Sequence, residues 1–450
     1  MRHRFVELLS VGKLVQSLRD KGWSLALVLL SAVLFGCSSN NDDAGPSVTS
    51  DFESGAIGEV EYLGAQSWEL YLADDNDNDA LPDSYRNWWY VRFDDLDRNQ
   101  ITEISLRNRG WQYYYVPVYS YDGEDWQHFE ESQVSITEAC NDGIEGCYLN
   151  ISAIFDEPTV YVARFYPYTY SQLQTYIASI EGDELVSLDT VGFSPEFDEP
   201  IQVITIENSD IPTMDKHYVW IHARSHPGET PASFMLEGIV EAVLANFRAG
   251  REIADELVFY INPMHNIDGV LVGNYRTNTF SQNLEIEWLI DTSEPLYLTG
   301  DAAEENRDLN FFMADIVTTQ SSANSIALNL HATNSDPDTD AFAYAHFGLD
   351  PTLYTPNEIA LFEKQDLFIN DIIANYDGHF IEAWEGGSGF LESPFPETWW
   401  WYNVGEQSLA LTIEAVYSKG TFGYWVTDED VRELGTAIAE SIFLHYESRR

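Results

Sequence analysis

The hydrophobic pattern of this sequence changes once, near residue 200, and that change limits the folds open to the chain. Before it, short segments rich in aromatic and β-branched residues follow one another between turn clusters. This spacing predicts an antiparallel β-sandwich. After it, short apolar segments alternate with longer helical patterns, as in residues 218–223, 232–249 and 257–262, which predicts an α/β domain. We therefore expect two domains, residues 51–198 and 199–450.

The charge of the chain excludes one class of partner. Lys and Arg number 22 against 75 Asp and Glu, a formal net charge of −53. Such a surface repels nucleic acid and anionic membrane, so we expect neither to bind the protein surface directly. A saline environment, whose ions screen self-repulsion, is one explanation of this charge, and an ordinary acidic protein is the other.

The first 36 residues are typical of an export signal. Basic residues lead into an apolar run from Trp23 to Phe35, which is short for a membrane-spanning helix. The run ends in Leu-Phe-Gly-Cys at residues 34–37, which resembles a bacterial lipobox. We predict cleavage before Cys37, a lipid on that cysteine and a flexible tether over residues 37–50. The protein would then be an exported bacterial lipoprotein, in the periplasm, the outer membrane or at the cell surface, and the lipid would be its only membrane contact. A plain N-terminal helix is the alternative.

Two more cysteines, Cys140 and Cys147, close a short loop. In an exported protein this spacing favours a structural disulfide, and two cysteines alone are too few for a zinc site.

An acidic loop places carboxylates at Asp75, Asp77, Asp79 and Asp83, as calcium-binding loops do. Ala80 stands where such loops favour glycine, and no glutamate follows at the usual end. A Ca²⁺ site and a solvated acidic loop therefore both remain open.

The densest chemical pattern lies where a predicted strand gives way to a helix. His226 and Glu229 are three residues apart in this turn, and Pro231 suits the first position of the helix. A tight turn lets both side chains face one ion, and imidazole and carboxylate are both zinc ligands. The spacing alone is common by chance and does not establish a site.

The surrounding residues make the pattern specific. Ala-Arg-Ser-His-Pro-Gly-Glu-Thr-Pro-Ala-Ser, residues 223–233, resembles the zinc signature of the cytosolic-carboxypeptidase-like branch of the zinc metallocarboxypeptidases. Residues 262–263, 268–270 and 273–276 resemble further stretches of that family in the same order. The likeness extends over nearly all of the mature chain, including the sandwich. It implies a second domain with a mixed central sheet flanked by helices, and an enzyme that removes C-terminal residues from peptides or proteins.

The resemblance also implies a set of site residues. One Zn²⁺ per chain would be bound by His226, Glu229 and His331, the last of these at the end of a predicted strand about a hundred residues after Glu229. Glu414, at another strand end, would be the general base, and Arg276 would stabilise the oxyanion. Three of these residues also have a structural interpretation, His226 and His331 as core or surface histidines and Glu414 as a salt-bridged strand end.

Relatives bind the terminal carboxylate of the substrate with an Asn-Arg pair, because a guanidinium pairs a carboxylate bidentately. In family register Glu285 and Ile286 occupy those two positions, so the pair would be lost. An insertion would instead displace the pair to Asn306 and Arg307. We favour the loss, which predicts that amidated or basic ends are better substrates than acidic ones. Tyr402 is a candidate for the tyrosine that the family places near its substrate.

Two other functions fit the same residues. One is a zinc amidase or deacylase acting on small N-acyl amino acids or cell-wall peptides. The other is a degenerate surface-binding lipoprotein without activity, against which the complete set of ligands and base argues.

Overall fold

The protein was analysed as a computed structural model that describes residues 45–110, 114–137, 148–320, 324–382 and 393–448. The described chain from Gly45 onwards forms one compact unit. Cys37, Cys140 and Cys147 lie outside the described residues, so the lipidation and the disulfide stay predictions. No helix within the described ranges is both long enough and apolar enough to cross a membrane.

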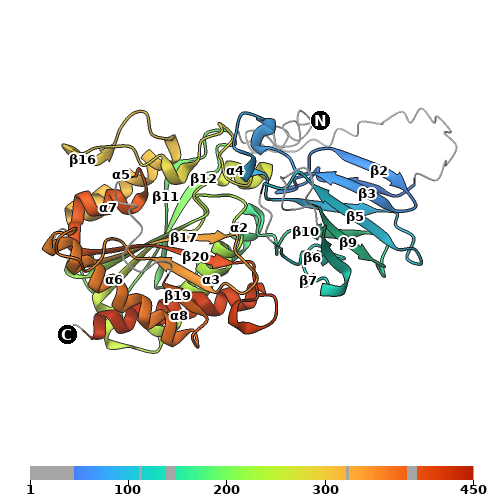
Figure 1. Ribbon diagram of the computed structural model, residues 1–450. Coiled ribbons are helices and arrows are strands. Elements are labelled where there is room, and N and C mark those ends of the chain that lie inside the picture. The colour runs from blue at the N-terminus through green and yellow to red at the C-terminus, as the bar shows by residue number, and fades with distance from the viewer. Residues whose placement is uncertain (1–44, 111–113, 138–147, 321–323, 383–392, 449–450) are drawn as a thin grey trace, which may run out of the picture. The chain divides into compact units, whose positions relative to one another are not determined.

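The N-terminal domain contains two five-stranded sheets (Figure 1). In sheet order, the first contains β1 (Ser47–Thr49), β4 (Tyr90–Asp94), β10 (Val160–Ala163), β6 (Val118–Ser120) and β7 (Gln127–His128). The second contains β2 (Val60–Gly64), β3 (Ser67–Tyr71), β5 (Thr102–Arg107), β9 (Leu149–Ala153) and β8 (Val134–Ile136). All neighbours are antiparallel except β3 and β5.

The two N-terminal sheets pack face to face around one apolar core. Alternate residues of β3, β5 and β9 from one sheet meet alternate residues of β4 and β10 from the other. This alternation is the period-two pattern of strands with one buried face. The predicted sandwich is therefore confirmed.

The C-terminal domain is built on an eight-stranded mixed sheet. In sheet order its strands are β11 (Val186–Phe193), β12 (Pro200–Glu207), β14 (Leu257–Asn262), β13 (His217–Ala223), β17 (Ser325–Thr333), β20 (Ser408–Val416), β18 (Ala341–Tyr344) and β19 (Phe380–Glu382). The four central strands β14, β13, β17 and β20 run parallel to one another. A separate hairpin pairs β15 (Ile290–Asp291) with β16 (Glu294–Leu298).

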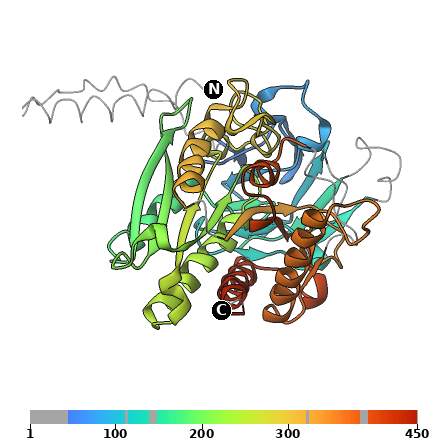
Figure 2. The same cartoon turned by 90° about the vertical axis from the view of Figure 1, so that its left-hand side faces the viewer.

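Helices cover both faces of this sheet, which explains why its central strands are almost continuously buried. Helices α3 (Pro231–Arg248), α6 (Pro356–Asn375) and α8 (Asp428–Glu447) pack together on one face, and α5 (Glu304–Thr319) and α7 (Pro396–Val404) lie on the other (Figures 1 and 2). Two further helices, α2 (Tyr170–Ile180) and α4 (Ile267–Val272), complete the described α-helices. The predicted α/β domain with a mixed, helix-flanked sheet is confirmed.

The structure corrects both predicted ends of the sandwich domain. Residues 47–49, assigned to the tether, form β1 and pair with β4. Strand β11 pairs with β12 in the C-terminal sheet, so the domain boundary lies before β11 and not at residue 198. Pro195 and the acidic residues that follow it form the turn between these two antiparallel strands. Strand β11 is a half-exposed edge strand, so its sequence lacks the apolar run that marks the inner strands.

Candidate metal centre

The first two predicted ligands lie in the turn between β13 and α3. Arg224 occupies the first position after β13 with a φ of 65°, a left-handed conformation that turns the chain sharply. Its guanidinium donates from Nε to the carbonyl of Pro227 at 3.1 Å and from an Nη to Ser233 Oγ at 2.8 Å. These bonds hold the turn so that His226 and Glu229 point to one side.

His331 and Glu414 come from neighbouring parallel strands. They are paired in register on β17 and β20. Residues paired in this way project to the same face of a sheet, so the two side chains lie side by side. Because β13, β17 and β20 are parallel, their carboxyl ends meet at the sheet edge where the turn carrying His226 also lies.

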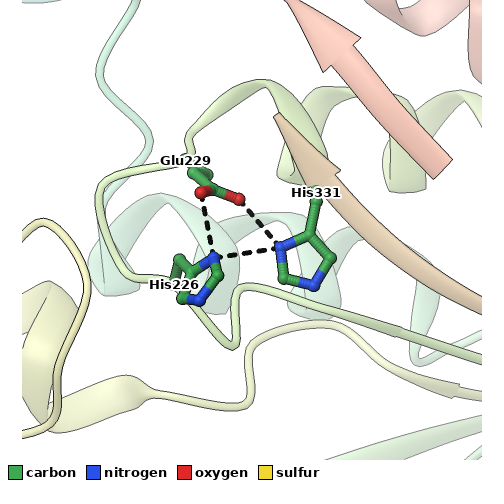
Figure 3. A group of neighbouring side chains, drawn as sticks. All are labelled: His226, Glu229 and His331. Carbon is green, nitrogen blue, oxygen red and sulfur yellow. Dashed lines mark hydrogen bonds and ion pairs between the residues drawn. The ribbon is translucent and has the colours of Figure 1, made fainter. Parts of the chain in front are cut away.

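The three predicted ligands converge (Figure 3). Glu229 places one carboxylate oxygen 2.9 Å from Nδ1 of His226 and the other 2.9 Å from Nδ1 of His331, and the two Nδ1 atoms are 3.1 Å apart. Each residue is only 3% exposed. Within the described part of the chain, no other group of three or more His, Cys, Asp or Glu side chains is spaced to share one ion.

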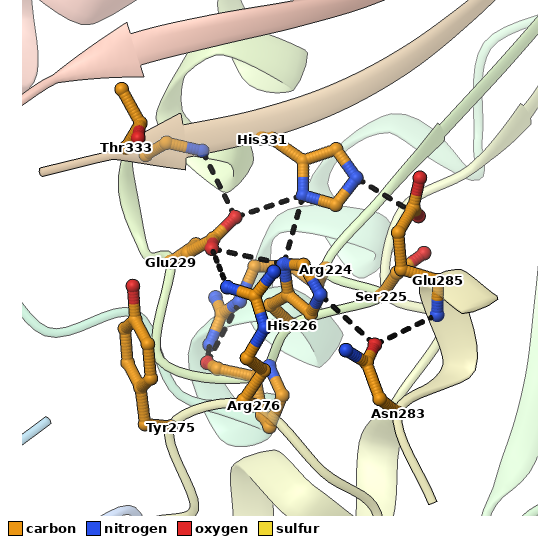
Figure 4. Close-up of polar contacts among 12 residues, drawn as sticks. Arg224, Ser225, His226, Glu229, Tyr275, Arg276, Asn283, Glu285, His331 and Thr333 are labelled. Carbon is orange, nitrogen blue, oxygen red and sulfur yellow. Dashed lines mark hydrogen bonds and ion pairs between the residues drawn. The ribbon is translucent and has the colours of Figure 1, made fainter. Parts of the chain in front are cut away.

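The far side of each imidazole faces an acceptor (Figure 4). His226 Nε2 lies 3.0 Å from Asn283 Oδ1, and His331 Nε2 lies 3.0 Å from Glu285 Oε2. Asn283 Oδ1 also accepts the N–H of Glu285, which identifies it as the oxygen. An acceptor at Nε2 keeps the ring proton there and turns the Nδ1 lone pair inward. Two imidazole lone pairs and a carboxylate then form a set of acceptors that fits a divalent cation such as Zn²⁺.

The electrostatics of the cluster favour positive charge. Burial alone would lower the pKa of His331, but the carboxylates of Glu285 and Glu229 raise it well above its ordinary value. Burial works to raise the pKa of Glu229, yet His226 and His331 hold it well below its usual range. A buried site that stabilises an imidazolium and a carboxylate in this way is suited to a cation.

Glu414 and Arg276 flank the cluster. Burial raises the pKa of Glu414 to about 8. Its Oε2 atom is buried without a hydrogen-bond partner in the described part of the chain. An Nη of Arg276 lies 3.7 Å from Glu229 Oε1 (Figure 4). The site thus combines a metal-binding set, a carboxylate oxygen with no protein partner and a guanidinium.

Comparisons with known proteins agree with this geometry. Residues 48–165 match the cytosolic carboxypeptidase N-terminal domain, and residues 173–341 match the zinc carboxypeptidase family. Together the two matches span more than half of the chain. The chain belongs to the zinc carboxypeptidase family.

Individual relatives that the chain resembles are cytosolic carboxypeptidases. Cytosolic carboxypeptidase 6 of Mus musculus is 28% identical over 250 residues, which are 53% of this chain and 45% of that protein. The Homo sapiens protein of the same name is 28% identical over 250 residues, or 53% of this chain and 48% of its own. The chain therefore spans about half the length of the curated relatives it matches.

Solved structures share the fold over both domains of this chain. A metallo-carboxypeptidase from Burkholderia cenocepacia has a TM-score of 0.72 and 21% identity, covering 90% of this chain and 100% of that one. A metallo-carboxypeptidase from Pseudomonas aeruginosa, in complex with (2-guanidinoethylmercapto)succinic acid, has a TM-score of 0.70 and 20% identity at the same coverage. At these identities the likeness shows the fold.

The structure does not bring the tentative substrate residues to the metal cluster. Asn306 is buried in the first turn of α5 and donates from Nδ2 to the carbonyl of Leu284. Arg307 donates to the carbonyl of Gly300, away from the ligands. Tyr402, in the last turn of α7, is 45% exposed. Among described residues, no hydrogen bond or ion pair joins Tyr402 to the ligands or to Glu414.

The acidic loop, for which a Ca²⁺ site and a solvated loop both remained open, contacts the C-terminal domain instead. Both oxygens of Asp75 accept N–H groups of the C-terminal domain, and Asp83 pairs with Arg86 at 2.6 Å. Asp79 is exposed. The loop does not form a cluster spaced for one ion, so the geometry does not support a calcium site.

Sequence reasoning missed the residues that support the ligands. It gave no role to Asn283, and it considered Glu285 only as a residue at a position of the lost Asn-Arg pair, whereas Glu285 also contacts a ligand. It also missed Glu397, a buried carboxylate that Asn329 Nδ2 joins to Glu285. The only signal available in the sequence was the alignment with the family pattern, in which an Asp-Leu pair precedes the Asn-Arg pair. Asn283 and Leu284 occupy the positions of that Asp-Leu pair.

Proposed function

We propose that the protein is a zinc-dependent metallocarboxypeptidase that hydrolyses the C-terminal residues of peptides or proteins. The observation that carries the proposal is the buried set of His226, Glu229 and His331 beside a carboxylate oxygen of Glu414 that has no partner in the described part of the chain. The family matches and the fold support the same conclusion.

Each residue of the site then has a chemical task. A zinc ion bound by the three ligands would lower the pKa of a water and polarise a carbonyl. Glu414, which faces the cluster from β20, accepts the proton of the attacking water and returns it to the leaving amine. The guanidinium of Arg276 stabilises the negative charge that develops on the carbonyl oxygen.

Zinc content and turnover on a peptide library test the proposal together. We expect one zinc per chain and stepwise loss of C-terminal residues, detected by mass spectrometry. Cleavage of N-acyl amino acids or cell-wall peptides in place of longer peptides would favour the amidase alternative. A protein that binds peptides without cleaving them would be the non-catalytic lipoprotein.

We further propose that the site lacks the arginine that would bind a free terminal carboxylate. In the family register Ile286 stands at that position, and Arg307 donates to a main-chain carbonyl elsewhere. Two buried carboxylates, Glu285 and Glu397, lie behind the ligands and are joined by Asn329. Negative charge disfavours an acidic end, so amidated or basic ends should be preferred. This observation keeps the amidase alternative open.

A pair of matched substrates decides this point. kcat/KM is measured for a peptide and its C-terminal amide, in the parent and in Arg307→Ala. We expect the amide to do at least as well as the acid, and Arg307→Ala to change neither value. A strong preference for the free acid that disappears in Arg307→Ala would place the carboxylate-binding residue at Arg307.

We also propose that the protein is exported and anchored by a lipid on Cys37, as the N-terminal sequence predicts. Cys37→Ser should accumulate as an unprocessed precursor without lipid, which metabolic labelling with a fatty acid would detect. A lipid-free mature protein cleaved at another residue would contradict this localisation.

A further inference from the structure

The loop that carries Arg276 is bound by a carboxylate from the other domain. Asp75 lies in the 3₁₀ turn η1 (Asp75–Asp77) of the N-terminal domain and is 4% exposed. Its Oδ1 accepts the main-chain N–H of Tyr275 at 2.7 Å, and its Oδ2 accepts those of Arg276 and Thr277, each at 2.8 Å. Thr277 Oγ1 adds a fourth bond at 3.1 Å. Three consecutive N–H groups therefore converge on one carboxylate.

This arrangement fixes the main chain on both sides of Arg276. Consecutive N–H groups that point to one anion form a concave nest, which requires one specific loop conformation. Bonds from N–H groups to a carboxylate are about twice as strong as neutral ones. In the described part of the chain no Lys or Arg pairs with Asp75, so these N–H groups are the principal partners of its charge.

The next residue extends the contact along the same loop. Asn76 and Asn274 form two hydrogen bonds with each other. Asn274 Nδ2 donates to Asn76 Oδ1 at 2.9 Å, and Asn76 N donates to Asn274 Oδ1 at 3.3 Å. Asn76 Nδ2 also donates to the carbonyl of Asn278 at 2.9 Å and to Ser281 Oγ at 3.1 Å. The N-terminal domain thus contacts the loop both before and after Arg276.

A second N-terminal residue contacts the functional groups themselves. The guanidinium of Arg276 lies over the ring of Tyr85, 5.4 Å from its centroid. The hydroxyl of Tyr85 accepts from Asn283 Nδ2 at 3.3 Å, and Asn283 Oδ1 faces Nε2 of the ligand His226. Tyr85 therefore touches both Arg276 and the residue that orients a metal ligand.

We propose that Asp75 and Tyr85 are positioning residues through which the N-terminal domain completes the active site. Asp75 sets the main chain that carries Arg276, and Tyr85 supports its guanidinium so that it points at the metal cluster. The C-terminal domain alone would then bind metal but hold Arg276 in many orientations. The inference rests on the proposed hydrolytic function, in which Arg276 stabilises the oxyanion.

The test is a double-mutant cycle in the full chain. Asp75→Asn keeps the size of the side chain but turns an amide donor toward N–H donors, so the loop loses its conformation. We expect kcat to fall about 10-fold to 100-fold with KM changed by less than about 3-fold and zinc content unchanged, since small misplacements of catalytic groups cost this much. In an Arg276→Ala background the same substitution should have almost no effect.

The control is Asp79→Asn, which removes an exposed carboxylate from the same acidic loop and should leave kcat at the parent value. If Asp75→Asn does not fold, Tyr85→Leu replaces it, because Tyr85 is half-exposed and its loss should lower kcat by about 5-fold to 20-fold only when Arg276 is present. The proposal would be overturned if the substitution lowered kcat as much in the Arg276→Ala background as in the parent. It would also be overturned if the folded single variant had the kcat of the parent.

A measurement without turnover separates this inference from the proposed function. Amide hydrogen exchange of residues 275–277 should be slow in the parent and about 100-fold faster in Asp75→Asn, whereas that of residues 226–229 stays unchanged. Equal exchange in both proteins would overturn the positioning role. If the parent cleaves no peptide although exchange responds as expected, the proposed function fails and the positioning of the loop stands.

Discussion

The two halves of the candidate site are positioned by different parts of the chain. The ligands His226, Glu229 and His331 stand on a turn and a strand of one sheet. The loop of Arg276 is bound by Asp75 and Tyr85 of the N-terminal domain. We call the three ligands the ligand half and the loop of Arg276 the arginine half. The position of the ligand half should depend on the C-terminal domain alone, whereas that of the arginine half should depend on the contact between domains. Substitutions in the first half should abolish metal binding or chemistry, and those in the second should weaken chemistry alone.

The largest effect is expected from removing a ligand. His331→Ala should lose both the metal and all measurable turnover, because two remaining ligands bind Zn²⁺ poorly. Metal content by atomic spectrometry and kcat on a peptide substrate check this. His379→Ala, a half-buried histidine that stacks on Phe422 away from the cluster, is the matched control and should retain both. Full zinc occupancy with normal turnover in His331→Ala would show that the ligand assignment is wrong.

The second largest effect is expected from Glu414→Gln, which should lower turnover without loss of the metal. Glu414→Gln should keep the fold and the zinc but lower kcat by about 100-fold to 10,000-fold, because an amide cannot accept the proton of the attacking water. Stopped assays with the zinc-loaded variant would measure it. Turnover within a few-fold of the parent would mean that the base is another residue.

A smaller effect, on zinc affinity, is expected from Glu285, which contacts the ligand His331. Glu285→Gln leaves the three ligands in place but removes the negative charge from the acceptor at His331 Nε2. Zinc affinity should fall about 10-fold to 100-fold, as is typical for partners of metal-bound histidines. Competition with a chelator measures the affinity, and an unchanged Kd would leave Glu285 without this role.

The smallest effect concerns stability and its pH dependence. Burial and the charge of Glu285 raise the pKa of Glu397 to about 7. A carboxyl whose pKa is raised on folding binds more protons in the native state, so stability falls as pH rises from the ordinary pKa towards 7. Glu397→Gln removes this penalty and should raise the free energy of unfolding by about 2 kcal/mol more at pH 8 than at pH 5. Denaturant unfolding at both values checks this, and an equal change at both would contradict it.

The comparison of the two halves also explains what the sequence could predict. The ligands His226 and Glu229 lie three residues apart in a local motif, and the inner strands are marked by apolar runs, so both could be predicted. Asp75 contacts a loop about 200 residues away and leaves no local pattern, and its carboxylate resembled a calcium ligand. Strand β11 is half exposed at the sheet edge, so the domain boundary was placed too late. Contacts between distant segments were the information that the sequence lacked.

The central claim is that one zinc ion in the ligand half makes this chain a peptidase. The most direct measurement strips the purified protein of metal and adds Zn²⁺ back while the release of C-terminal residues is followed. The account predicts no turnover in the stripped protein and a linear rise in activity that ends at one ion per chain. Full turnover without metal, or zinc binding at that stoichiometry with no release of C-terminal residues from any peptide, would contradict it.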